Sequence, residues 1–501
     1  MKNKTGVCRA LLLVGMGLMI PCYLFTAGNT LLSPWPLYDR NRLALCLLTP
    51  LCLLLLLLLG RAAKAKVFET HERSVLLGFA AFYFVIQLVM ASALRFTPVT
   101  DLEQCVTAAR RLAQTGAFGD SERSLIYFGR YPHNMGLVYL LAGIFKAADA
   151  LDADELMAAA LVCGLLFSMG LLCAARLCRR LGGAQAQARA LLLFATCLPF
   201  LYCTSELYTD AFSVAFAPMI VFAFFKARDA GSRKKRALWA LLFAVCTFFG
   251  AQIRFPTIIA AIACLIAALF EKRAKLTALL AAPLALVFAV GGSAVNAANK
   301  ANLGAANIAQ NKLPKLHYIA MGLPVQSDEG YGQYGYGGWL IFSTSFDDPQ
   351  ARDEALRQEV VDRAYTLAHH PAQLLSTLSR KNLSTFGRGT FNLNEIFEAD
   401  AHEADNAVKQ AVFENGRFNR AYTHLATAMF VAQMALACIA CIQAIRRRDT
   451  RAAPLFLTLL GAFLFLSIWE TRARYFFQFM MILLCAGAMF ETPSTHAAQK
   501  A

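Results

Sequence analysis

Charged residues are scarce in this sequence. Only 16% of its 501 residues are Asp, Glu, Lys or Arg, whereas 58% are hydrophobic. Soluble domains carry roughly a quarter of their residues as charged side chains, so this composition excludes an ordinary soluble globule. Apolar runs such as residues 43–59 are long enough to cross roughly 30 Å of hydrocarbon as a helix of about 20 residues. The sequence therefore predicts an all-α, polytopic transmembrane protein.

Patterned cysteines are also missing. Most of the 15 cysteines lie in apolar runs, where Cys behaves as a small hydrophobe, and residues 299–420 contain none. The single CxxC pair, Cys438 and Cys441, is inside an apolar run and has no second pair or histidine nearby. A disulfide framework and a zinc site are therefore not indicated. No internal repeat of about 20–50 residues is visible either.

Positive charge is in excess, with a formal net charge of +16, but it is not gathered into one patch. It occurs as short clusters between apolar runs, such as 61–66, 176–180, 233–236, 272–275 and 446–448. Clusters of this kind fix the orientation of membrane spans, because cytoplasmic loops are enriched in Lys and Arg. This pattern argues against nucleic acid as a partner. The first apolar run is long and has no small-residue cleavage site, so we interpret it as a retained helix.

The apolar runs predict about 12 spans, near residues 10–27, 42–60, 75–94, 155–177, 188–204, 211–226, 237–252, 256–270, 276–296, 422–445, 453–468 and 474–490. With both termini cytoplasmic, every strong basic cluster falls on the cytoplasmic side of the cytoplasmic membrane. Residues 135–145 are apolar but too short to span, and we expect a helix along the outer face. The expected organisation is two additional N-terminal helices (1–74), a transmembrane core (75–298), an extracytoplasmic segment (299–420) and C-terminal spans (421–501).

The extracytoplasmic segment divides into a loop and two helices. Residues 313–338 contain two prolines and a Gly/Tyr stretch, which favour a loop. Asp348 and Pro349 provide an N-cap and a first-turn proline for a helix that reaches His369. Pro371 ends that helix, and a second is expected over 372–383.

The hydrophilic stretch 95–134 is the first candidate site. It begins where the apolar run 75–94 ends and carries Asp101 and Glu103 near its start. It closes on a basic and aromatic cluster whose members are Arg130, Tyr131, His133 and Asn134. A carboxylate beside the membrane can act as a general base on an acceptor hydroxyl. The alternative is an ordinary charged loop in which Asp101 caps a helix.

Three further groups of charged residues fall on the same predicted membrane face. Glu206 and Asp210 lie between two spans, at a depth where ionisable groups are costly and often functional. Arg254 is flanked by apolar runs and can pair with phosphate through its planar fork. The last group is Glu470, Arg472, Arg474 and Tyr475. Capping, snorkelling and structural ion pairing are the respective alternatives. His317 is a weaker candidate, because a packed or hydrogen-bonded histidine explains it better than a functional one.

These motifs resemble the GT-C superfamily of polyprenyl-phosphate-sugar glycosyltransferases, and in particular bacterial relatives of protein O-mannosyltransferases and aminoarabinose transferases. The matching elements are Thr100-Asp101, Tyr131-Pro132, Tyr208-Thr209-Asp210, and Glu470 with Arg474-Tyr475. Two departures stand out. Leu102 separates Asp101 from Glu103, where the family often has adjacent acids, and Tyr131-Pro132-His133 replaces a Lys-Pro-Pro or Tyr-Pro-Pro element.

The resemblance implies a mannosyltransferase-like enzyme that acts outside the cytoplasmic membrane. It would transfer a sugar, with inversion, from a polyprenyl-phosphate-linked donor to an extracytoplasmic hydroxyl acceptor. Asp101 would be the base, with Glu103, Glu206 or Asp210 as acid/base or metal-linked groups. The donor phosphate would contact Arg130, Arg254, Arg472 and Arg474, while the substrate would be lined by Tyr131, His133, Asn134, His317 and Tyr475.

Three questions stay open at this point. No cofactor is certain, and the need for a divalent metal is undecided. Tyr334, Tyr336 and Trp339 either cover the sugar or only pack the outer loop. The alternative function is a multi-span transporter or flippase of lipid-linked saccharides, which should show inverted repeats and a midplane site.

Overall fold

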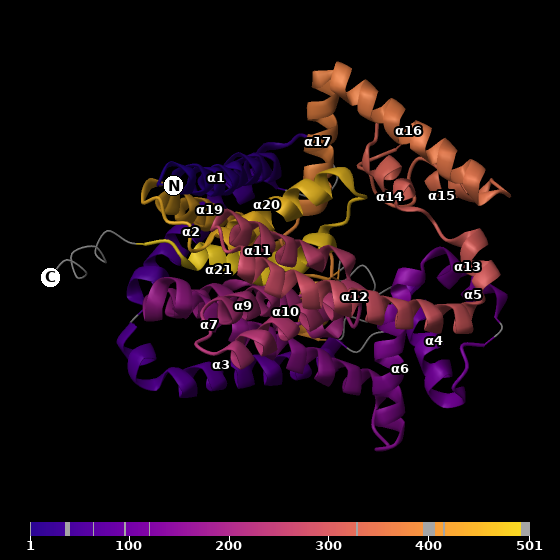
Figure 1. The fold of residues 1–501 in the computed structure, drawn as a ribbon, viewed down its shortest axis with the longest axis horizontal. Helices are drawn as coiled ribbons and strands as arrows, with labels where there is room; N and C mark the ends of the chain where they lie inside the picture. Colours follow the sequence, from indigo (N-terminus) through magenta and orange to yellow (C-terminus); the bar gives the residue numbers. More distant parts are fainter. Residues whose placement is uncertain are drawn as a thin grey trace.

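The computed structural model describes residues 2–35, 41–63, 65–94, 97–119, 121–326, 329–393, 406–413 and 416–491. All regular elements within these ranges are helices (Figure 1). The predicted all-α class is therefore confirmed. Parts of the predicted stretches 95–134, 313–338 and 299–420 fall outside the described residues, as do the last ten residues of the predicted C-terminal segment.

Eight helices in the described ranges are long and apolar enough to cross a membrane. They are α1 (Lys2–Leu32), α2 (Arg42–Ala62), α3 (Ala65–Leu94), α7 (Glu155–Thr196), α8 with α9 (Thr209–Ser213 and Phe216–Arg228), α10 (Arg233–Ile253), α12 (Ala274–Leu303) and α19 (Asn419–Arg446). Shorter apolar helices follow at η4 with α11 (Phe255–Thr257 and Ile258–Phe270), α20 (Ala453–Ile468), and η6 with α21 (Ala473–Phe479 and Met480–Ala488).

Helix α7 contains two of the predicted spans. Gly182 and Gly183 leave the helical conformation, and Gly183 has a φ of 74°, which glycine adopts without strain. The chain folds back there, because Phe167 before the break and Phe200 after it have ring centroids 5.1 Å apart. The predicted span 188–204 is too long as a helix. It ends at Thr196 and continues as the 3-10 turns η2 (Leu198–Leu201) and η3 (Cys203–Ser205), because Pro199 lacks the N–H that would continue the α-helix.

The two N-terminal helices are integrated into the bundle. α1 packs against α19 and α20, and α2 packs against α19. The Tyr23 hydroxyl on α1 is buried and donates a hydrogen bond to the Leu459 carbonyl on α20 at 3.2 Å. These helices are therefore part of the same hydrophobic core as the spans that follow them.

The basic clusters predicted to be cytoplasmic gather at one end of the bundle. The Arg9 side chain donates to the Arg448 carbonyl at 2.9 Å, and Arg180 forms an ion pair with Asp229. Arg228, at the end of α9, lies 3.8 Å from Glu271 in the turn between α11 and α12. The cytoplasmic position of this end stays a prediction from the charge pattern.

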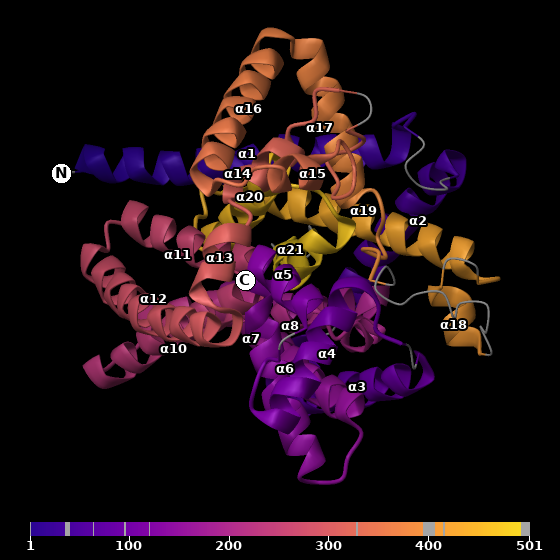
Figure 2. The same cartoon turned by 90° about the vertical axis from the view of Figure 1, so that its right-hand side faces the viewer.

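The opposite end is built from short helices. They are α4 (Thr100–Thr115), α5 (Glu122–Arg130), η1 (Pro132–Asn134), α6 (Met135–Asp149), α13 (Ala305–Asn311), α14 (Lys315–Gly322) and α15 (Trp339–Thr344). The sequence interpretation expected only the one over residues 135–145, and the others fall in stretches for which it predicted no helix. Figure 2 faces this end, with α5 and α13 near the middle, α14 and α15 above them, and α4 and α6 below. In both views α6 runs vertically, across the direction of α3, as expected for a helix along the membrane face.

The extramembrane helices α16 (Pro349–His369) and α17 (Pro371–Phe386) confirm the two that were predicted, and α18 (Ala407–Val412) follows. The Asp348 carboxylate accepts hydrogen bonds from the backbone N–H groups of Gln350 and Ala351, as an N-cap does. The Gly/Tyr stretch forms turns, as predicted for a loop. Its glycines at 330, 332, 335, 337 and 338 all have positive φ.

We expect the two ends of the bundle to lie on opposite sides of the membrane. In a variant without native cysteines, Asp353→Cys on the exposed face of α16 should react with a membrane-impermeant maleimide added to intact cells. Lys234→Cys, at the start of α10, should react only after the cells are opened. The reverse pattern would contradict the orientation.

Candidate functional site

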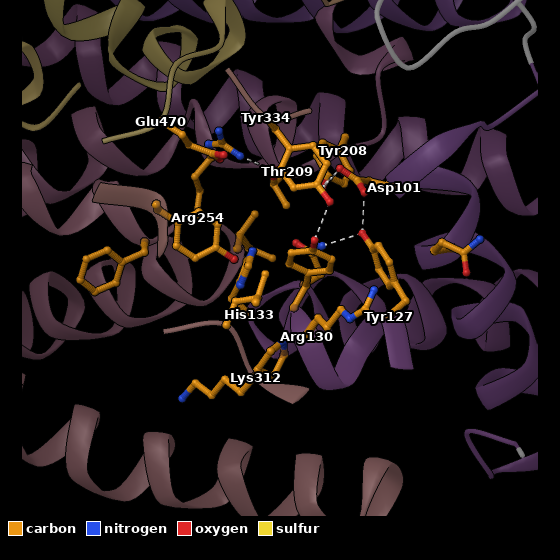
Figure 3. A pocket seen from close by; sticks show the side chains of 18 of the residues that line it. Asp101, Tyr127, Arg130, His133, Tyr208, Thr209, Arg254, Lys312, Tyr334 and Glu470 are labelled. Carbon is orange, nitrogen blue, oxygen red and sulfur yellow. Dashed lines mark hydrogen bonds between the residues drawn. The ribbon is translucent and has the colours of Figure 1, made fainter. Parts of the chain in front are cut away.

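A cavity of about 970 Å³ lies at the end of the bundle formed by the short helices. Its walls come from α4, α5 and η1, from the segments that follow α10 and precede α8, and from the chain between α20 and η6. Figure 3 shows Asp101 and Tyr127 on one side of the cavity, Arg254 and Glu470 on the other, and Lys312 below them. Segments far apart in the sequence therefore meet in one site.

Asp101 lies in the first turn of α4, with its side chain 43% exposed to the cavity. The Tyr127 hydroxyl donates a hydrogen bond to Asp101 Oδ1 at 2.8 Å, and Asn134 Nδ2 donates to that hydroxyl at 2.9 Å. The N-cap of α4 is Val99, so the capping alternative does not describe Asp101. Its carboxylate is instead held by side chains from α5 and η1.

A fully buried carboxylate joins two arginines beside Asp101. Asp210 Oδ1 is 3.0 Å from Arg254 Nε, and its Oδ2 is 3.4 Å from Arg474 Nε. Arg254 also donates to the Thr209 hydroxyl at 2.8 Å, and Arg474 Nη2 is 4.0 Å from Asp101 Oδ2. The side chains therefore form a row of alternating charge, which runs from Asp101 through Arg474 and Asp210 to Arg254.

Tyrosine rings support the two arginines. The Arg254 guanidinium lies 4.3 Å from the centroid of Tyr475, and that of Arg474 lies 5.4 Å from the centroid of Tyr208. A cation over an aromatic face is stabilised by the ring quadrupole. Tyr475 also donates a hydrogen bond to the Glu470 carboxylate. Burial raises the pKa of Glu470 above its usual range, while that hydrogen bond acts in the opposite direction.

Glu206 is buried next to this row of charged side chains and does not line the cavity. Burial, and then the Asp210 carboxylate, raise the pKa of Glu206 well above its usual value. A raised pKa favours the protonated carboxyl, which cannot accept a proton as a general base does. The structure brings Glu206 close to the site but gives it no access to a substrate.

The other predicted site residues separate into two groups. Those that line the cavity are Glu103, Arg130, Tyr131, His133, Asn134, Arg254, Arg472, Arg474 and Tyr475. His317 does not line it: the ring is buried, and Nδ1 lies 2.7 Å from the Ser343 hydroxyl. Among the outer-loop aromatics only Tyr334 faces the cavity, 2.8 Å from the Tyr131 hydroxyl, whereas Trp339 packs on Arg363 and Tyr336 is exposed.

Several lining residues were missed at the sequence level. Lys312 and Lys315 lie at the junction of α13 and α14, on either side of Leu313 and Pro314. The rings of Tyr318 and Trp469 are stacked with their centroids 5.2 Å apart. The two lysines lie in the segment predicted to be extracytoplasmic. They were a usable signal, because positive charge on the outer side departs from the topology rule. The stacked pair comes from α14 and the end of α20, so no local pattern could have paired them.

No metal site is evident in the part of the chain that the structure describes. Within these residues, His, Cys, Asp and Glu form no group of three or more close enough to share an ion. Asp101 and Glu103 lie two positions apart in α4, and Glu103 points to the exposed side.

Most of the sequence matches one protein family. Residues 42–495 match the family described as "conserved hypothetical integral membrane protein". The chain belongs to this family. The description of the family as integral membrane proteins agrees with the eight long apolar helices of the structure.

Comparison with solved structures finds a distant likeness to ArnT from Cupriavidus metallidurans bound to undecaprenyl phosphate. The TM-score is 0.36 and the identity 12%, over 83% of this chain and 77% of the other. No curated protein matches.

The buried Asp210 should be the charge on which the stability of this end depends. Asp210→Asn leaves two arginines without their shared counter-ion, and breaking a buried ion pair costs about 3–5 kcal/mol. We expect a clear fall in the midpoint of thermal unfolding of the detergent-solubilised protein. Glu103→Gln, which also removes one negative charge but from an exposed position, is the matched control. Equal effects of the two substitutions would refute this role of Asp210.

Proposed function

We propose that this integral membrane protein is a glycosyltransferase that moves a sugar from a polyprenyl-phosphate donor to a hydroxyl acceptor outside the cytoplasmic membrane. One observation carries the proposal: an accessible carboxylate, Asp101, shares a cavity at the membrane surface with several arginines. A transfer of this kind needs a base for the acceptor and cations for the departing phosphate.

The position of Asp101 suits a general base. Its Oδ1 accepts the hydrogen bond from Tyr127, while Oδ2 has only longer contacts, 3.5 Å to the Tyr208 hydroxyl and 4.0 Å to Arg474. Oδ2 is thus the oxygen available to an incoming hydroxyl. The bond from Tyr127 orients the carboxylate, and Asn134 in turn orients Tyr127.

The cations suit an anionic leaving group. Arg130, Arg254, Arg472 and Arg474 all line the cavity, together with Lys312 and Lys315. Guanidinium groups bind phosphate oxygens through charge-assisted hydrogen bonds, and they stabilise charge that develops during bond breaking. Asp210 neutralises part of the charge of Arg254 and Arg474, which leaves Arg130 and the lysines as the less compensated cations.

Access from the bilayer supports a lipid-borne donor. The outer end of α12 contributes Val295, Asn296 and Asn299 to the cavity. Only 6% of the residues in the apolar 18-residue window of α12 are buried, so most of this helix faces lipid. Phe255, which is 47% exposed, adds an apolar surface on the same wall. A polyprenyl chain can remain in the bilayer while its phosphate enters the cavity.

The proposed step is a single displacement with inversion. The acceptor oxygen bonds to the anomeric carbon, and the bond from that carbon to the phosphate oxygen breaks. The acceptor proton passes to Asp101 Oδ2, and the phosphate keeps the electron pair and leaves as polyprenyl phosphate. The cations lining the cavity stabilise the charge that it gains.

Asp101→Asn should lower the rate of sugar transfer by about 10²–10⁴, the usual contribution of a general base. The amide still accepts the hydrogen bond from Tyr127, so folding and binding of the donor lipid should be retained. Transfer is measured with radiolabelled donor in proteoliposomes, and donor binding by native mass spectrometry. Transfer at the parental rate would rule out Asp101 as the base. Movement of the donor lipid across the bilayer with no covalent product would instead favour a flippase.

Arg254 offers a second test, of the contact with the donor phosphate. Arg254→Ala should weaken binding of the donor lipid by about tenfold or more, because a charge-assisted hydrogen bond contributes roughly 1.5–3 kcal/mol. Arg254→Lys keeps the charge but loses the planar fork, so it should restore binding only in part. Binding of the uncharged polyprenol is the control and should not change. Parental affinity in both variants would remove Arg254 from the phosphate site.

A further inference from the structure

A buried lysine joins the extramembrane helices to the cavity. Lys381 lies on α17, and its side chain is 1% exposed. Its Nζ donates hydrogen bonds to the carbonyl oxygens of Gly322 and Trp469, the latter at 2.7 Å. Gly322 is the last residue of α14, and Trp469 is the C-cap of α20. One lysine thus satisfies backbone carbonyls at two helix C-termini.

The chemistry of this junction explains why a lysine is present. Carbonyls at a helix C-terminus have no partner within the helix and carry partial negative charge, so they favour a cation. Burial lowers the pKa of Lys381 to about 7, and the nearby Glu470 acts in the opposite direction. A neutral amine still has two N–H donors for the two carbonyls. The junction therefore persists in either protonation state.

The backbones at this junction approach closely. A Cβ added to Gly322 would lie 2.3 Å from the Ile468 carbonyl oxygen and 2.6 Å from the Trp469 carbonyl carbon. Only glycine allows α14 and α20 to meet at this distance. The stacked rings of Tyr318 and Trp469, which line the cavity, come from the same two helix ends. The position of this cavity wall thus depends on the contact between the two helices.

A second contact from α17 holds residues 470–472, which follow Trp469. Ser384, one turn after Lys381, lies 3.0 Å from the Thr471 hydroxyl. Thr471 N–H donates to the Gly332 carbonyl at 2.9 Å, and its hydroxyl donates to the Tyr331 carbonyl at 2.9 Å. Glu470 and Arg472, on either side of Thr471, line the cavity. The helix and the Gly/Tyr loop together fix this short segment.

We propose that Lys381 is a positioning residue: by holding the ends of α14 and α20 together, it places Trp469, Glu470 and Arg472 in the cavity wall. Lys381 itself touches no substrate. The expected effect of Lys381 on donor binding rests on the proposed function. The role of Lys381 in holding the cavity wall does not depend on that function. The extramembrane segment is thereby a support of the site.

The test compares Lys381→Met with Lys300→Met in the full-length protein. Lys300 is an exposed lysine near the end of α12 and does not line the cavity, so the same chemical change there is the matched control. Hydrogen–deuterium exchange should become at least tenfold faster at Thr471 in Lys381→Met, with no change in Lys300→Met. The dissociation constant for undecaprenyl phosphate, measured per folded molecule, should rise by about tenfold. A purely structural role would lower the yield and melting temperature but leave this constant at the parental value.

Each outcome decides a separate point. Unchanged exchange at Thr471 overturns the proposal, as does faster exchange with parental lipid affinity. If Lys381→Met does not fold, Ser384→Ala replaces it, and it should show the same two effects at smaller size; parental values would again overturn the proposal. A parental protein that binds no undecaprenyl phosphate contradicts the donor assigned under the proposed function, while exchange at Thr471 still tests the junction.

Discussion

The ion pairs of Asp210 with Arg254 and Arg474 are the constraint on which the cavity end of the structure depends. A carboxylate with no exposed surface is costly unless opposite charges compensate it. Arg254 and Arg474 supply that compensation, and they lie 44 and 264 positions after Asp210 in the sequence. The start of α8, the end of α10 and the start of η6 must therefore stay together. Asp101, which is 4.0 Å from Arg474, adds α4 to the same assembly.

This arrangement explains how a hydrophobic bundle supports a polar site. The spans bring their ends to one membrane face, and short helices laid over that face close the cavity. Three of the tyrosines that line the cavity also support its charged groups: Tyr475 lies against Arg254, Tyr208 against Arg474, and Tyr127 holds Asp101. The polar groups are thus preorganised by contacts that exist without a substrate, as electrostatic catalysis requires.

The extramembrane segment and the N-terminal helices contribute to the same site indirectly. On one side, α17 holds the Trp469–Thr471 segment through Lys381 and Ser384. On its other side, Asn29 of α1 donates a hydrogen bond to the Ser379 carbonyl at 2.6 Å. Helix α1, one of the two helices expected as additions before residue 75, therefore braces α17, and through it the cavity wall.

The sequence by itself determined the all-α membrane class, the approximate position of each span and the extramembrane helices α16 and α17. These follow from local properties, namely apolar length, basic clusters and capping residues. It also identified most charged residues of the cavity, because charges that interrupt apolar runs are conspicuous. It failed for α4, although the buried Leu102, Cys105, Val106 and Ala109 show helical spacing, because a hydrophilic stretch was interpreted as a loop.

Only the tertiary structure decided which charges meet. The pairing of Asp210 with Arg474, the exclusion of Glu206 and His317 from the cavity lining, and the convergence of two helix ends on Lys381 all join residues distant in the chain. Composition and periodicity describe each helix separately. Packing and the need to compensate buried charge act between helices, and these forces determine the site.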